Sequence, residues 1–111
     1  MLFRSSKNKI VCRSISAIDF FTIKDSLILD IREDYEEPKL DLESIKSVPL
    51  SELDNFLKDV DKIQKIILLC QHGNRSELAV DYLIKKGFEN VFHLQDGINK
   101  LVRTNELEDK T

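Results

Sequence analysis

The most apolar run of the chain, Ile-Gln-Lys-Ile-Ile-Leu-Leu at residues 63–69, constrains the fold more than any other feature. A nearly continuous apolar run of this length is typical of a strand that is buried on both faces of a parallel sheet. It leads directly into Cys70 and a loop with Gly73, and a helical pattern then runs from Ser76 to the stop at Gly87. A strand, a loop and a helix in this order predict a parallel α/β sheet with residues 63–69 at its centre.

Shorter patterns along the chain fit the same architecture. Apolar runs predict further strands at residues 10–12, 26–31, 48–50 and 91–94, and helical patterns predict helices at 18–23, 51–57 and 98–103. Ser16 and Ser51 are the expected N-caps of the first two helices. The fold class predicted is three-layer α/β, with a mainly parallel central sheet flanked by helices.

Length and composition predict one domain over residues 1–111, with a core at about 10–103 and a polar tail at 104–111. The chain is 41% hydrophobic and has only 3 Gly and 2 Pro, which favours a folded domain over disorder. A net charge of −3 argues against a general nucleic-acid partner. No apolar stretch has the roughly 20 residues that cross a bilayer, so no membrane association is expected.

The two cysteines, Cys12 and Cys70, lie far apart, and one possible bridge is a poor framework for a secreted domain. We therefore expect a reducing, cytoplasmic location, in keeping with an N-terminus that has no signal-peptide pattern. The cysteines and His72 and His93 lack zinc-type spacing, and no glycine-rich nucleotide loop is present. No metal and no cofactor are expected.

The loop Cys70-Gln71-His72-Gly73-Asn74-Arg75-Ser76 is the candidate site, because ligands of open α/β sheets bind beyond the carboxyl ends of the strands. Its backbone N–H groups and the helix that follows form a cradle for an anion, and the same field favours a thiolate at Cys70. Gly73 permits a turn that a side chain would obstruct, and Arg75 offers a planar fork for an oxyanion. The residue types alone also allow a buried structural Cys70, a surface Arg75 and a merely solvated His72.

Five segments in order resemble those of single-domain rhodaneses, the sulfurtransferase family. They are residues 29–33 (Leu-Asp-Ile-Arg-Glu), 48–53 (Val-Pro-Leu-Ser-Glu-Leu), the loop 70–76, 87–91 (Gly-Phe-Glu-Asn-Val) and 94–98 (Leu-Gln-Asp-Gly-Ile). The resemblance covers about Ile10 to Arg103. The chain departs from the family at residues 40–47, where a Gly-His-Ile-Pro-Gly-Ala-like segment is usual, and at Asp96-Gly97 in place of Gly-Gly.

The resemblance implies a mechanism in which Cys70 attacks the outer sulfur of a small anionic donor such as thiosulfate. The resulting persulfide on Cys70 is passed to a thiophilic acceptor, for example a thiol or a sulfur-carrier protein. Arg75 would bind the donor, and Asp30 and Arg32 would brace the loop, with a structural ion pair the better reading for the last two.

Other functions stay open at the level of sequence. The fold would also serve as a non-catalytic interaction module that presents the acidic stretch 33–43 to a protein partner. The cell-cycle phosphatases that share the fold of this family have a loop with the pattern Cys-x5-Arg. In this chain Cys70 and Arg75 form the pattern Cys-x4-Arg, and the shorter loop favours sulfur transfer over phosphoryl transfer. A redox role would need Cys12 to resolve an oxidised Cys70.

Overall fold

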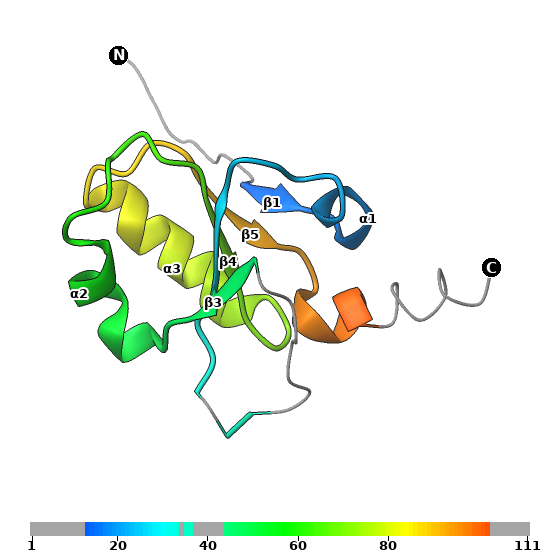
Figure 1. Ribbon diagram of the computed structural model, residues 1–111. Coiled ribbons are helices and arrows are strands. Elements are labelled where there is room, and N and C mark those ends of the chain that lie inside the picture. Colours follow the sequence, from blue (N-terminus) through cyan, green and yellow to red (C-terminus); the bar gives the residue numbers. More distant parts are fainter. Residues whose placement is uncertain (1–12, 34, 37–43, 103–111) are drawn as a thin grey trace, which may run out of the picture.

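A computed structural model gives the structure, which describes residues 13–33, 35–36 and 44–102 (Figure 1). The elements, in chain order, are β1 (Ser14–Ile15), α1 (Ala17–Phe20), β2 (Leu27–Asp30), β3 (Ile45–Ser47), the 3₁₀ turn η1 (Leu50–Glu52), α2 (Leu53–Leu57), β4 (Ile66–Leu69), α3 (Asn74–Lys85) and β5 (Val91–Leu94). Residues 97–102 form further helical turns. No helix among these described segments is both long enough and apolar enough to cross a membrane.

The strands form one parallel sheet in the order β1-β5-β4-β2-β3 (Figure 1). Residues 66–69 of the strand predicted at 63–69 form β4 in the middle of the sheet, and residues 63–65 precede it. Leu68 of β4 is in register with Leu29 of β2 and His93 of β5. Because all strands run the same way, the carboxyl ends of β2, β4 and β5 meet at one edge. The predicted parallel sheet and its central strand are confirmed.

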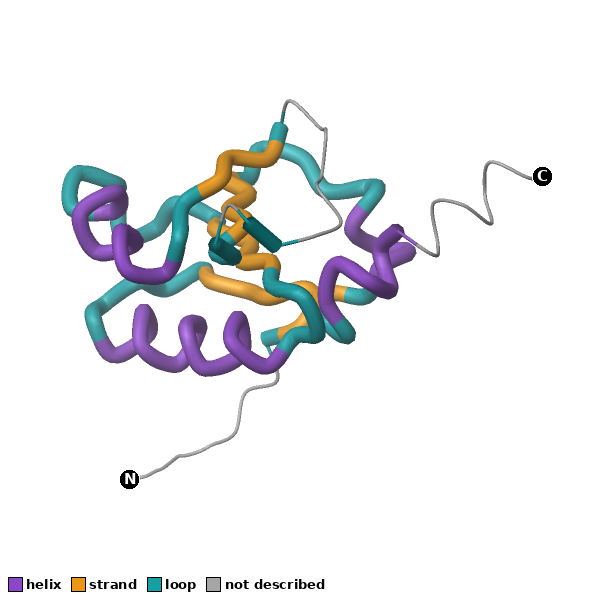
Figure 2. The backbone as a smooth tube through the Cα atoms, turned by 90° about the horizontal axis from the view of Figure 1, so that it is seen from below, coloured by secondary structure: helices purple, strands orange, loops and turns teal. Residues whose placement is uncertain are grey.

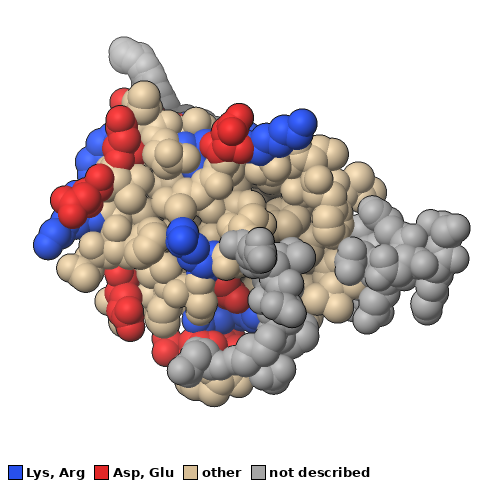
Figure 3. Space-filling model, viewed as in Figure 1, with Lys and Arg blue, Asp and Glu red and all other residues tan. Residues whose placement is uncertain are grey.

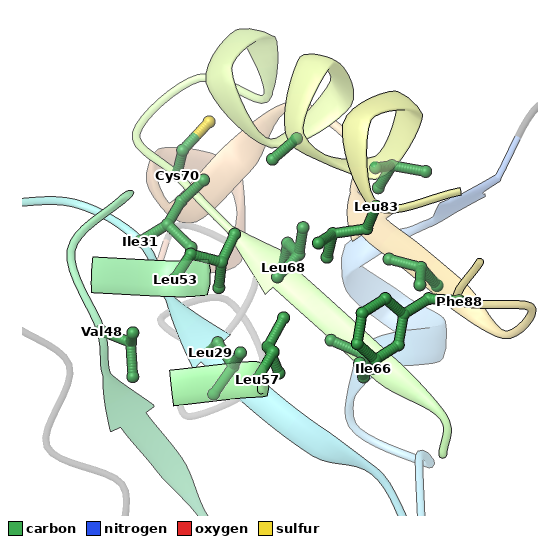
Figure 4. Close-up of a cluster of buried hydrophobic side chains, with 13 residues drawn as sticks. Leu29, Ile31, Val48, Leu53, Leu57, Ile66, Leu68, Cys70, Leu83 and Phe88 are labelled. Atoms are coloured by element: carbon green, nitrogen blue, oxygen red, sulfur yellow. The ribbon is translucent and has the colours of Figure 1, made fainter. Parts of the chain in front are cut away.

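Two hydrophobic clusters lie on opposite faces of the sheet, because successive side chains of a strand point to opposite sides. Ile66 and Leu68 of β4 pack with buried residues of α2 and α3 (Figure 4), whereas Ile67 and Leu69 pack with α1 and residues 97–102. All four side chains of β4 have no exposed surface. Figure 2 shows the strands running between the helices, so the three-layer α/β class is confirmed.

Two element boundaries differ from the prediction at the edge of the sheet. The strand expected at 48–50 lies at Ile45–Ser47, because Pro49 has no N–H to donate to the ladder. Pro49 (φ −53°) instead leads into η1, and the following helix has no side-chain cap from Ser51. The N-cap predicted at Ser16 is confirmed, since its hydroxyl accepts from the Asp19 amide at 3.1 Å. The strand expected at 10–12 lies outside the described residues.

The helix after the candidate loop begins at Asn74, two residues earlier than the pattern predicted. Gly73 is its N-cap and adopts a left-handed conformation (φ +95°), which only glycine reaches without strain. Arg75 and Ser76 therefore belong to the first turn of α3, where backbone N–H groups have no partner within the helix. This shift places two further members of the loop at the helix N-terminus.

Candidate functional site

The sulfur atom of Cys70 accepts two backbone hydrogen bonds. Cys70 follows the last residue of β4, and its Sγ lies 3.1 Å from the amide nitrogen of Gly73 and 3.3 Å from that of Ser76. The Ser76 hydroxyl is 3.4 Å from the same sulfur. Figure 4 shows the sulfur turned toward the loop and the first turn of α3, away from the rest of the cluster. The Cys70 sulfur therefore has three polar contacts, with two backbone amides and one hydroxyl.

The electrostatic setting of this sulfur favours negative charge. The N–H groups at the start of a helix carry the positive end of its dipole, equivalent to about half an elementary charge, and α3 is 12 residues long. Such N–H groups stabilise negative charge that lies against them. Cys70 is only 1% exposed, so water screens these dipoles weakly. The arrangement suits a bare sulfur anion.

A second chain segment crosses directly over the loop and fixes its backbone. The Ile98 amide donates to the Cys70 carbonyl at 2.8 Å, and the Asn99 amide donates to the Gln71 carbonyl at 3.3 Å. Gly97 (φ +75°) makes this crossing possible, because a Cβ at that position would overlap the Gln71 carbonyl and lie 2.6 Å from the His72 nitrogen. The loop thus has its shape set by the turn after β5.

A buried ion pair braces the loop from the neighbouring strand. Arg32, which is 2% exposed, donates from Nε and Nη2 to the two carboxylate oxygens of Asp30, each at 3.0 Å. Its Nη1 reaches across to Oε1 of Gln71 at 2.7 Å, and Gln71 Nε2 donates to Oδ1 of Asn99 at 2.5 Å. This series of hydrogen bonds, from Asp30 through Arg32 and Gln71 to Asn99, therefore connects β2, the loop and residues 97–102. The Asp30–Arg32 pair thus contacts the loop through Gln71, and the supporting role of these two residues stays a prediction.

The guanidinium of Arg75 pairs with Glu36. Its Nη1 and Nη2 donate to the two Glu36 oxygens at 2.8 and 2.6 Å, a bidentate geometry. Oε2 of Glu36 also accepts from the Glu33 amide at 2.9 Å. The hydrogen bonds from Arg75 hold the pKa of Glu36 at about 2, and Glu36 in turn raises the pKa of Arg75. One residue of the acidic stretch is therefore part of the site.

His93 on β5 reaches the site through Ser76. Its Nδ1 lies 3.2 Å from the Ser76 hydroxyl, which also contacts the Gly73 carbonyl at 3.2 Å. Burial lowers the pKa of His93, and the nearby Glu77 carboxylate opposes this shift. The imidazole lines a hollow of about 230 Å³ with His72 and six other residues. His93 is therefore neutral at neutral pH and is a polar neighbour of the cradle.

The predicted loop residues other than Arg75, which pairs with Glu36, divide into two groups. Cys70, Gln71, Gly73 and Ser76 meet around the sulfur or its bracing network, whereas Asn74 and His72 are exposed and line the hollow beside His93. The sequence analysis missed three contributors: Glu36, His93 and Asn99. Only Glu36 had a usable signal, since it follows the Leu-Asp-Ile-Arg-Glu segment at the end of a predicted strand.

Known proteins resemble this chain in both sequence and structure. The family model described as the rhodanese-like domain matches residues 16–104. A tRNA uridine(34) hydroxylase of Hamiltonella defensa is 36% identical over 92 residues, which are 77% of this chain and 26% of that protein. A tRNA sulfurtransferase of Serratia proteamaculans is 37% identical over 71 residues, 60% of this chain and 15% of that protein.

A crystal structure of a rhodanese-related protein from Thermoplasma volcanium superposes with a TM-score of 0.70 at 33% identity, covering 83% of this chain and 92% of that one. The chain belongs to the rhodanese-like domain family. It spans only 26% and 15% of the lengths of the two curated relatives named above. Family membership connects the chain with sulfur chemistry.

Replacing Gly97 by alanine should disturb the loop more than the same change at Gly87. Both positions have positive φ, but only at Gly97 would the new Cβ overlap backbone atoms; at Gly87 the nearest atom is 3.9 Å away. We expect Gly97→Ala to cost about 1–3 kcal/mol more than Gly87→Ala in urea unfolding and to slow iodoacetamide labelling of Cys70. Equal losses of stability in the two variants would contradict the crossing as the constraint.

The protein should lose stability as pH falls below about 6.5 because of His93. Its pKa is lower in the folded state, so the unfolded chain binds more protons in this range and unfolding is favoured by acid. Urea unfolding at pH 7.5 and 5.5 should show a smaller acid-dependent loss in His93→Gln than in the wild type. An unchanged pH dependence in the variant would exclude His93 as the source.

Proposed function

We propose that this protein is a sulfurtransferase that carries sulfane sulfur as a persulfide on Cys70. The observation that carries the proposal is the pair of amide hydrogen bonds to the Cys70 sulfur at the N-terminus of α3. Membership of the rhodanese-like family and the name of the Serratia relative, a tRNA sulfurtransferase, support it. A sulfur nucleophile stabilised in this way suits attack on another sulfur atom.

The proposed reaction has two displacement steps. In the first, the Cys70 thiolate attacks the outer sulfur of a donor, the donor's S–S bond breaks, and the leaving group departs with the electron pair. With thiosulfate, the simplest small anionic donor, the leaving group is sulfite. In the second step an acceptor thiolate attacks the terminal sulfur of the persulfide, and the Cys70 thiolate is released. The amides of Gly73 and Ser76 stabilise the negative charge on sulfur at each stage.

The remaining loop residues have supporting roles in this proposal. Gln71, held by Arg32, keeps the loop in shape, and Ser76 adds a hydroxyl beside the sulfur. Arg75 lies close enough to Cys70 for its charge to act on the thiolate. His72 and Asn74 form the exposed rim that an acceptor, either a small thiol or a sulfur-carrier protein, would approach. The chemistry needs a reduced cysteine and so a reducing compartment such as the cytoplasm.

Purified protein treated with millimolar thiosulfate or with glutathione persulfide should gain about 32 Da, one sulfur atom, on the peptide that contains Cys70. Cyanide or dithiothreitol should remove the added mass. Cys70→Ser should gain none while keeping the far-ultraviolet circular dichroism spectrum of the wild type. Absence of the gain with both donors, in protein that is folded and fully reduced, would rule the proposal out.

The same variant separates this function from a non-catalytic interaction module. A module of that kind would keep its partner and its cellular role in Cys70→Ser, because binding would use the surface and not the sulfur. A sulfurtransferase should lose its cellular role in that variant. Wild-type protein that never carries extra sulfur, together with a fully functional Cys70→Ser, would favour the interaction module.

A further inference from the structure

The anion-binding fork of Arg75 is already filled. Glu36 takes both terminal nitrogens of the guanidinium and is itself anchored by the Glu33 amide. The side chain of Glu36 is only 18% exposed, and its pKa of about 2 keeps it ionised at physiological pH. A small anionic donor would have to displace a bidentate carboxylate to use Arg75.

The second guanidinium at the loop is compensated as well. Arg32 is paired with Asp30 and bound to Gln71, so its charge is neutralised within the brace. Within the part of the chain that the structure describes, the two guanidinium groups that contact the loop or lie in it therefore each face a carboxylate. On the face shown in Figure 3, lysine and arginine are interspersed with aspartate and glutamate. A dianion at this mouth therefore meets backbone dipoles and guanidinium groups that already have a carboxylate partner.

A mainly apolar hollow of about 300 Å³ lies beside Arg75, which lines it together with Asp54. Leu50, Leu53, Leu78, Ala79 and Tyr82 supply most of its wall. Arg75 lines the hollow and belongs to the loop that begins at Cys70, so the hollow borders the candidate site. Three of the wall residues are substantially exposed: Leu50 at 43%, Leu78 at 72% and Tyr82 at 41%. A surface of this kind favours the hydrocarbon part of a ligand.

We propose that the preferred sulfur donor is an organic persulfide, R–S–SH, whose apolar group R lies in the hollow beside Arg75, and that Glu36 disfavours thiosulfate by occupying Arg75. This inference rests on the proposed sulfurtransferase function and specifies its donor. The Cys70 thiolate attacks the terminal sulfur, the donor's S–S bond breaks, and R–S⁻ leaves with the electron pair. The proton of the donor's SH group passes to R–S⁻, so the products are R–SH and the Cys70 persulfide anion.

Glu36 is a positioning residue in this scheme, because it acts on the donor through Arg75. In Glu36→Gln the fork loses its counter-charge, and we expect kcat/KM for thiosulfate to rise about tenfold, mainly through a lower KM. The rate with benzyl persulfide should change less than about twofold, since that donor does not use the fork. Glu33→Gln removes the same charge from the same segment and should change neither rate.

Two further variants test whether Glu36 acts through Arg75 and whether the hollow holds the R group of the donor. In an Arg75→Gln background, Glu36→Gln should have no additional effect on thiosulfate, because the fork is gone. Leu78→Ser should lower the rate with benzyl persulfide severalfold and leave methyl persulfide unchanged. Ile84→Ser removes an exposed side chain from the same helix outside the hollow and should affect neither persulfide.

The outcomes distinguish this inference from the proposed function. Loss of all sulfur loading with thiosulfate and both persulfides would overturn the sulfurtransferase function itself. Loading that proceeds, but with a thiosulfate rate unchanged in Glu36→Gln, would overturn only the role of Glu36. A benzyl persulfide rate unaffected by Leu78→Ser would overturn the assignment of the hollow to the donor.

Discussion

Two backbone N–H groups directed at one sulfur atom are the contact on which the rest of the site depends. They converge because β4 places Cys70 at the sheet edge, Gly73 reverses the chain in a left-handed conformation, and α3 begins at once. The first N–H groups of a helix have no acceptor within the helix. The Ser76 amide is one of these groups, and the Cys70 sulfur accepts its hydrogen bond. Loop geometry and helix formation thus stabilise one another.

The order of the carboxyl ends along the sheet explains why distant segments meet at this sulfur. β2 and β5 flank β4, so the residues that follow each of them come to the same edge. From β2 comes the Asp30–Arg32 pair, and from beyond β5 come Gly97 and Asn99. The segment after β2 also supplies Glu36, so the last residue of β2 and the segment that follows it provide the carboxylate partners of Arg32 and Arg75. The positive charges of Arg32 and Arg75 are therefore both compensated by carboxylates from one continuous stretch of the chain, residues 30–36.

Sequence reasoning found the parts of this site that are local and missed those that depend on pairing. The central strand, the loop and the helix after it are contiguous, and their patterns are strong. Glu36 is 39 residues from Arg75, and Asn99 is 28 residues from Gln71, so only the fold brings each pair together. The sequence pointed to the acidic stretch as a surface for a protein partner, yet one of its carboxylates, Glu36, forms an ion pair with Arg75. The edge strand was also predicted at the wrong residues and lies at Ile45–Ser47, because Pro49 cannot donate a hydrogen bond to the neighbouring strand.

The size of the cradle bears on which chemistry it suits. The described loop directs two amides and one hydroxyl at the sulfur itself, and the arginine that would surround a phosphate is held by Glu36. A phosphoryl group has several charged oxygens, and it would lack the free fork that usually binds them. A persulfide, in contrast, adds one S–S bond of about 2.05 Å and keeps its charge on sulfur. The outer sulfur would lie beyond the Cys70 sulfur, so the residues around the opening, among them Arg75 with its partner Glu36, would set which molecule gives or takes it.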